Sequence, residues 1–237
     1  FENERIADMH AEQLAWKIGD TISALRLMWA QACCLYDSRN QSEAIMILDS
    51  IAQFTEKNGI QEDPNLIYPI KTDYYLERKD IKCAEILLRE YEYKTGILTE
   101  SLDTLNYDMA HFYLKGKYYN IAQKPDSAIQ MFNKLLHLLG QRPLYTSQRH
   151  GLKEVSYQGL TEAYSLKHNP DSVIKYANLY CQWNDSSTRA KSSEHLLRYQ
   201  SLYNYTKIQE QALKAVQKAS RLRIIMILLV VMGIAIA

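Results

Sequence analysis

The sequence predicts an all-α protein, a solenoid of helical hairpins followed by a long helix. Large and small residues recur in four segments without gaps, at spacings that place them on helix faces. The chain has only eight Gly and five Pro, and no strand-like alternation persists along it. We therefore expect helical hairpins over residues 20–185 and a long uninterrupted helix beyond them.

Composition narrows the class of protein further. Of the 237 residues, 47% are hydrophobic and 23% are charged, which is ordinary for a folded chain and argues against wholesale disorder. The formal net charge is +1, so no global basic field exists that would recruit nucleic acid. We expect no nucleic acid contact in this region.

The first 19 residues predict a separate helix. Helix-forming residues run from about 3 to 18, and Gly19-Asp20-Thr21 then breaks the helical pattern. We interpret residues 1–19 as a helix that is a candidate remnant of an upstream repeat.

The repeat is defined by a small residue near the start of each second helix. Nine residues before it lies a large residue on the first helix, and a further large residue lies seven positions earlier. A seven-residue spacing puts both large side chains on one helix face, and the small residue lets the two helices approach closely. The small residues are Ala44, Ala84, Ala128 and Val173; the large residues are Leu35, Tyr75, Tyr119 and Tyr164, preceded by Met28, Tyr68, Phe112 and Tyr157.

Helix ends are also encoded locally. Asp126 and Asp171 each follow a proline, and we expect their side chains to cap the second helices of the third and fourth hairpins. Gly96 and Gly140 lie where second helices should end.

These residues resemble the tetratricopeptide repeat (TPR) family over roughly residues 20–185. The third copy carries the clearest motif, with Gly116-Lys117-Tyr118-Tyr119 closing its first helix. The small residues are 40, 44 and 45 positions apart, whereas the family repeat is about 34 residues long. Longer first helices or longer connections must absorb the difference. Another α-solenoid and a compact helical bundle are the alternatives.

Residues 186–223 predict a long connecting helix, because no Pro or Gly occurs there. Apolar residues fall on alternating three- and four-residue steps, which makes a weak coiled-coil seam and a candidate homodimer contact through residues 188–223. A single solvated helix is the alternative. The seam residues are Leu202, Tyr205, Ala212, Val216 and Ala219, with Gln209 interrupting them.

Residues 224–237 are uncharged and strongly apolar, and we expect them to be the start of a truncated transmembrane helix. This run is shorter than the roughly 20 residues that a span requires. A buried core helix is the alternative. Basic residues precede the run, which taken alone favours cytoplasmic repeats. These residues are Lys214, Lys218, Arg221 and Arg223.

No catalytic pattern is present in the sequence. We find no glycine-rich phosphate loop, no nucleophile motif and no pair of His on a helix face, and the six His are scattered singly. The four Cys have no zinc-site spacing. We therefore predict no enzymatic activity, no catalytic residue, no cofactor and no metal.

The TPR resemblance implies a partner-binding groove lined by first helices. A mixture of aromatic residues and both charge signs suits a peptide or helix of a protein partner. The Lys/Asn clamp by which some TPR domains hold a terminal carboxylate is not reproduced. The groove positions implied for this chain are Arg26, Trp29, Tyr36, Asp73, Tyr113, Lys117, Asn120, Gln158 and Glu162.

The order of repeat array, long helix and single span resembles that of bacterial membrane-anchored TPR regulators. That resemblance implies a non-enzymatic sensor or scaffold region in a signalling or transcription-regulating protein, with periplasmic repeats and a cytoplasmic output domain. The alternative is a membrane-anchored assembly scaffold with cytoplasmic repeats and no signalling output.

Overall fold

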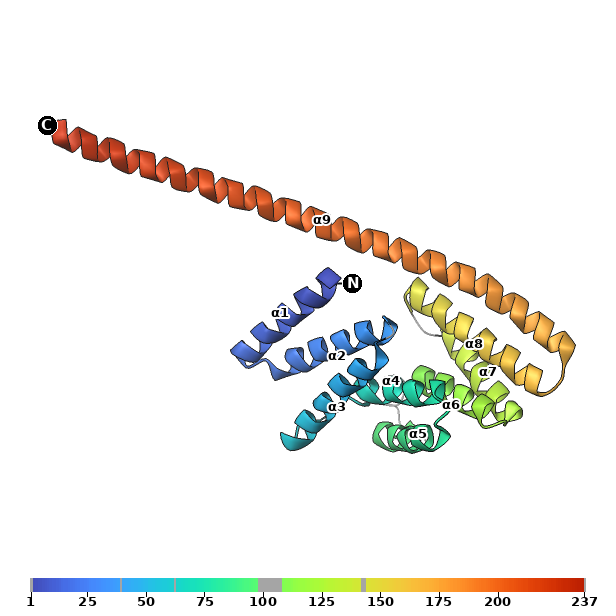
Figure 1. The fold of residues 1–237 in the computed structure, drawn as a ribbon. Coiled ribbons are helices and arrows are strands. Elements are labelled where there is room, and N and C mark those ends of the chain that lie inside the picture. Colours follow the sequence, from blue (N-terminus) through green and yellow to red (C-terminus); the bar gives the residue numbers. More distant parts are fainter. Residues whose placement is uncertain (1, 39, 62, 98–107, 142–143, 237) are drawn as a thin grey trace. The chain divides into compact units, whose positions relative to one another are not determined.

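The computed structural model describes residues 2–38, 40–61, 63–97, 108–141 and 144–236, and among these all regular elements are helices (Figure 1). The predicted all-α class is confirmed. The helices are α1 (Glu2–Ile18), α2 (Thr21–Asp37), α3 (Gln41–Lys57), α4 (Pro64–Glu77), α5 (Ile81–Thr95), α6 (Asp108–Ile121), α7 (Pro125–Gln141), α8 (Thr146–Leu166) and α9 (Pro170–Ile236).

The chain divides into two compact units, Phe1–Asn184 and Asp185–Ala237. The first unit holds α1 to α8 and the beginning of α9, and it contains all the buried core described below. The second unit is the continuation of α9.

Adjacent helices of the first unit pack as hairpins. Helices α2 and α3, α4 and α5, and α6 and α7 lie against each other in pairs. Helix α8 pairs with the start of α9, where the rings of Tyr164 and Tyr176 stack with centroids 5.2 Å apart. The first helices also contact one another in the order α2, α4, α6, α8. Each second helix in addition contacts the first helix of the next hairpin, as α7 does with α8.

The four hairpins close with the same backbone geometry. In each, the amide of the last connecting residue donates to the carbonyl of the large first-helix residue that the sequence pattern singled out. The middle connecting residue has a positive φ at Lys79, Gln123 and His168. These bonds join Asn40 to Leu35, Asp80 to Tyr75, Lys124 to Tyr119 and Asn169 to Tyr164, over 2.8–3.1 Å.

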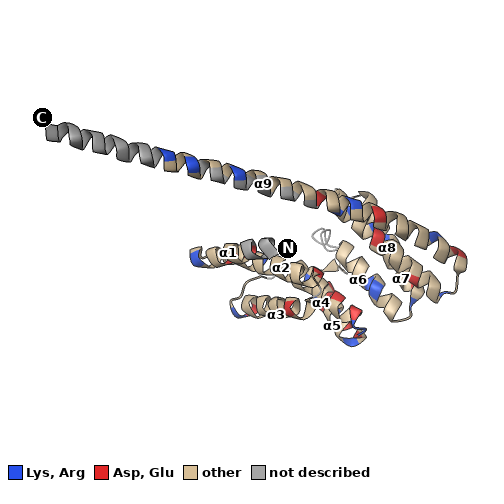
Figure 2. Ribbon diagram, turned by 45° about the horizontal axis from the view of Figure 1, so that its top comes forward, with Lys and Arg blue, Asp and Glu red and all other residues tan. Residues whose placement is uncertain are grey.

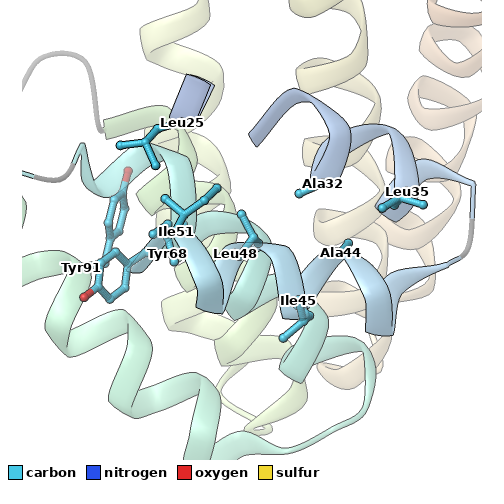
Figure 3. Close-up of a cluster of buried hydrophobic side chains, with 10 residues drawn as sticks. Leu25, Ala32, Leu35, Ala44, Ile45, Leu48, Ile51, Tyr68 and Tyr91 are labelled. Atoms are coloured by element: carbon cyan, nitrogen blue, oxygen red, sulfur yellow. The ribbon is translucent and has the colours of Figure 1, made fainter. Parts of the chain in front are cut away.

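The small residues of the motif lie where the hairpin helices meet. Each is the fourth residue of its second helix, and Ala44, Ala84 and Ala128 are fully buried. Figure 3 shows the first of the core clusters, in which side chains of α2, α3, α4 and α5 come together. In this cluster the rings of Tyr68 and Tyr91 stack with centroids 6.1 Å apart. The repeat pattern therefore corresponds to real packing positions.

The helix-end predictions are confirmed only in part. Helix α9 starts at Pro170 and is capped by Asn169, whose Oδ1 accepts from the Ser172 amide at 3.0 Å, so Asp171 lies within the first turn and is not the cap. Asp126 likewise lies in the first turn of α7, and it accepts a hydrogen bond from Lys167 at 2.6 Å. Gly96 ends α5 with φ 63°, as predicted, whereas α7 continues through Gly140 to Gln141.

The ring of Phe132 wedges between two first helices. Phe132 lies on α7 and is 1% exposed. A Cβ added to Gly116 on α6 would lie 2.7 Å from its Cζ atom, and one added to Gly159 on α8 would lie 2.1 Å from it. Both helices therefore reach the ring only because they carry glycine there.

Part of the extra repeat length lies in a longer first helix, since α8 is 21 residues long whereas α4 has 14. The alternative of longer connections falls, between α5 and α6, on residues 98–107, which lie outside the described residues.

The predicted connecting helix lies within α9, which runs unbroken to Ile236. Among the proposed seam residues, Val216 is 66% exposed, and the side chains of Leu202, Tyr205, Gln209, Ala212 and Ala219 lie outside the described residues. Within the described part of the chain, no helix carries an apolar stretch long enough to cross a bilayer.

Candidate partner-binding site

Four of the nine predicted groove residues meet at one carboxylate. Asp73 on α4 accepts hydrogen bonds from the hydroxyl of Tyr36 on α2 at 3.2 Å and from the hydroxyl of Tyr113 on α6 at 3.4 Å. It also accepts from the ammonium of Lys117 on α6 at 2.6 Å. A single carboxylate therefore joins three successive first helices. We call Tyr36, Asp73, Tyr113 and Lys117 the Asp73 cluster.

The two phenols of the Asp73 cluster are held protonated. Burial raises the pKa of Tyr36 and of Tyr113 well above the usual tyrosine range, and the carboxylates of Asp73 and Glu77 raise both further. The hydroxyls therefore remain hydrogen-bond donors at any physiological pH. Lys117 also lies over the Tyr113 ring, 5.9 Å from its centroid.

Three further predicted residues meet where α6 and α8 pack together. The Asn120 side-chain amide donates to the Gly159 carbonyl at 2.9 Å and to Glu162 Oε2 at 3.3 Å. The Gln158 amide donates to Glu162 Oε1 at 3.3 Å. Asn120 is buried, whereas Gln158 and Glu162 are exposed. Glu162 is thus the carboxylate of this second group.

The two groups share one repeat position. Asp73, Lys117 and Glu162 each lie eleven residues before the small residue of their hairpin. Because the first helices contact one another in order, equivalent positions fall on the same side of this layer. We call this side, carrying Asp73, Lys117 and Glu162, the first-helix face.

Arg26 and Trp29 stand apart from these groups. Arg26 is exposed near the start of α2, and its charge acts on Asp20. Trp29 packs against the first core cluster, and its indole nitrogen is buried without a hydrogen-bond partner among the described residues. Neither contacts the Asp73 cluster in any interaction that the structure shows.

Sequence reasoning missed Glu77, which adjoins the Asp73 cluster. Its Oε1 lies 3.8 Å from Lys117 Nζ, and its Oε2 accepts from the Gln41 amide at 2.6 Å. Glu77 follows Asp73 by one helical turn, so the i, i+4 spacing on α4 was an available signal.

A second charged group missed from the sequence lies between α5 and α6. Glu92 is 6% exposed and accepts hydrogen bonds from Lys115 Nζ and, at 2.8 Å, from His111 Nε2. Burial alone would raise the pKa of the Glu92 carboxyl, but these two donors outweigh it and hold that pKa below its usual value. No local sequence pattern predicts this contact, because His111 and Lys115 lie 19 and 23 residues from Glu92 along the chain.

The first-helix face offers hydrogen-bond donors, carboxylates and aromatic edges, which suits recognition of a polar segment. Among the described residues no group of His, Cys, Asp or Glu could hold a metal ion.

Removing the Asp73 carboxylate should loosen three helices at once. We expect Asp73→Ala to lower the free energy of unfolding by about 2 kcal/mol, since Lys117 loses its closest partner and two half-buried phenols lose their acceptor. Urea unfolding of the full chain measures the change. Spectrophotometric titration should show Tyr36 and Tyr113 ionising at lower pH, because a charge that raises their pKa is gone.

Asp49→Ala is the matched control. Asp49 pairs with Lys71 at 2.6 Å, but its side chain is 45% exposed, so we expect a loss below about 1 kcal/mol. Equal losses for the two variants would contradict a special role of Asp73.

The fold defines an all-α protein of packed helical hairpins, with a first-helix face that gathers seven of the nine predicted residues. Comparison with protein-family models gives no match. Searches of curated proteins and of solved structures give no significant match either.

Proposed function

We propose that this chain is a TPR-like array that binds a segment of a protein partner on its first-helix face, as a non-enzymatic sensor or scaffold region of a membrane-anchored signalling protein. The observation that carries the proposal is the Asp73 cluster together with the Asn120 group. Side chains from α2, α4, α6 and α8 there form one polar and aromatic surface across four hairpins. Interfaces of this composition are typical of peptide recognition.

Assignment to the TPR class rests on the shared geometry of the hairpins. All four connections carry the same backbone hydrogen bond to the same repeat position. The small residue has the same place in each second helix. Gly116 and Tyr119 close the first helix of the hairpin with the clearest motif.

Membrane attachment is proposed from the sequence, whereas periplasmic placement and signalling output are proposed from the resemblance to bacterial membrane-anchored TPR regulators. The apolar run at residues 224–237 supports attachment, and the basic residues before it match the flank of a span. Homodimerisation through residues 188–223 is also proposed from the sequence, because of the weak coiled-coil seam along this helix.

A bulky residue on the first-helix face tests the binding proposal. Gln158 is exposed beside Glu162, and Gln158→Trp places a large neutral side chain there. We expect the full-length variant to lose the proteins that the wild type retains in affinity capture from an extract of cells that make it. Binding should fall at least about tenfold, because the introduced indole ring would clash with the bound segment of the partner.

Gln53→Trp is the control for this experiment. Gln53 is exposed on α3, a second helix, and the same substitution there should leave capture unchanged. Far-UV circular dichroism should show equal helicity for both variants. Retention of the same proteins by both variants would count against the first-helix face as the binding site.

A further inference from the structure

Carboxylates outnumber cations on the first-helix face. Asp73 and Glu77 on α4 lie beside Lys117 on α6, and Glu162 lies on α8, the next first helix. Figure 2 marks the acidic residues of α4 and α8 and the basic residues of α6 in separate colours. The convergence is also visible at Tyr113, because all three carboxylates raise the pKa of this one phenol.

The single ammonium group neutralises only one of these carboxylates. Lys117 Nζ lies 2.6 Å from Asp73 but 3.8 Å from Glu77, so its closest ion pair is with Asp73. Glu77 receives a hydrogen bond from the neutral amide of Gln41. Glu162 receives only neutral amide donors among the interactions that the described residues show.

The neighbouring cations leave a small excess of negative charge. Arg78 stacks on the Tyr74 ring, 3.5 Å from its centroid, and donates to Gln41 Oε1 at 3.0 Å, and the amide of the same Gln41 side chain donates to Glu77. Lys115 pairs with Glu92 between α5 and α6. Counting Asp73, Glu77 and Glu162 against Lys117 and Arg78, these side chains carry a net charge of −1, and no cation contacts Glu162 among the interactions that the described residues show.

An independent observation points to a missing donor at the same place. Asn120 is 5% exposed, and its Oδ1 atom has no hydrogen-bond partner among the described residues. The amide nitrogen of the same side chain reaches Glu162. A buried acceptor left open costs free energy that a donor group would recover. The Oδ1 atom is closed to solvent, so a donor group of a partner at Glu162 reaches it only if the Asn120 side chain moves.

We propose that the partner segment bound by the first-helix face is basic, with lysine or arginine side chains received at Glu77 and Glu162. This inference rests on the proposed function and adds the charge of the partner to it. The aromatic edges of Tyr36 and Tyr113 lie beside the carboxylates and suit the apolar stem of such a side chain. Charge complementarity of this kind sets partner choice and association rate.

Two synthetic peptides test the proposal with the full chain. One alternates lysine and tyrosine, and its twin carries glutamate in place of each lysine. Fluorescence anisotropy should show that the lysine peptide binds and that its affinity falls as salt is added. The double variant Glu77→Gln, Glu162→Gln should bind it at least about tenfold more weakly. Lys117→Gln should bind it more tightly, since the competing cation is gone.

The double variant Glu56→Gln, Glu90→Gln is the matched control. It removes two exposed carboxylates from second helices and should leave the affinity for the lysine peptide within about twofold. The glutamate peptide controls for contacts with the basic residues of α9, and any binding of it should not depend on Glu77 or Glu162.

The inference is overturned if the wild type does not bind the lysine peptide, or if the Glu77 and Glu162 variant binds it unchanged. These experiments distinguish an error about the charge of the partner from an error about the binding site. If Gln158→Trp abolishes partner capture while the glutamate variants leave lysine-peptide binding intact, the face binds a partner whose recognition is not basic. If Gln158→Trp leaves capture intact, the site itself is wrong.

Discussion

Gly159→Ala should strongly destabilise the array. The new Cβ would lie 2.1 Å from Phe132 Cζ and 2.4 Å from Cε2, and the ring is already fully buried between α6 and α8. Alanine gains about 1 kcal/mol of intrinsic helix propensity over glycine in α8. The overlap costs more, so we expect a net loss of about 2–3 kcal/mol in the free energy of unfolding. Urea unfolding followed by circular dichroism measures it.

Gly140→Ala is the control, because a Cβ at Gly140 meets nothing within 4 Å. This change in α7 should be neutral or stabilise by up to about 1 kcal/mol. Phe132→Leu provides a second check, since leucine lacks the Cζ and Cε atoms that approach Gly159. The two changes together should cost less than their sum. Additive costs would show that the Phe132 ring is not the obstacle.

Glu92→Gln should have the other large effect. It leaves the partly buried ammonium of Lys115 without its carboxylate and weakens the acceptor of His111 between α5 and α6. Breaking a buried pair from one side costs about 3 kcal/mol or more. Asp126→Asn is the control, because Asp126 pairs with Lys167 over 2.6 Å with both side chains exposed, and this change should cost at most about 1 kcal/mol.

The pH dependence of stability tests whether the effect of Glu92→Gln comes from the loss of the carboxylate charge. Its carboxyl has a lowered pKa in the folded state, so the folded chain binds its proton less readily than the unfolded chain. The contribution is therefore present above the ordinary pKa of 4.5 and is lost as pH falls through the lowered folded value. Urea unfolding at neutral pH and in this acid range should show a smaller stability difference between wild type and Glu92→Gln in acid. An equal difference at both pH values would argue against a charge effect.

Local sequence signals were sufficient for the hairpins. The small residues Ala44, Ala84 and Ala128 located the second helices because backbone approach depends only on the size of the side chain at the crossing. Gly19 and Gly96 marked helix ends because a positive φ favours glycine. Capping was less predictable. Asn169 and Asp171 are both polar residues beside Pro170, and only the conformation of the connection decides which one faces the free amides.

The candidate site was only partly predictable. Asp73, Lys117 and Glu162 could be placed on one face because they share a repeat position. That Asp73 binds Lys117, while Glu162 meets only amides, depends on how neighbouring first helices are offset. The sequence pattern within one helix contains no information about that offset.

The sequence by itself determined the all-α class, the number of residues between packing positions, and the glycines at Gly19 and Gly96 that end helices. These features follow from helix periodicity and backbone conformation, which are local. Only the tertiary structure decided that Phe132 requires glycine on two other helices, that Glu92 is buried with His111 and Lys115, and that Tyr36 and Tyr113 share one carboxylate. Each of these contacts joins residues from different helices, and their distances follow from the packing of whole helices rather than from spacing along the chain.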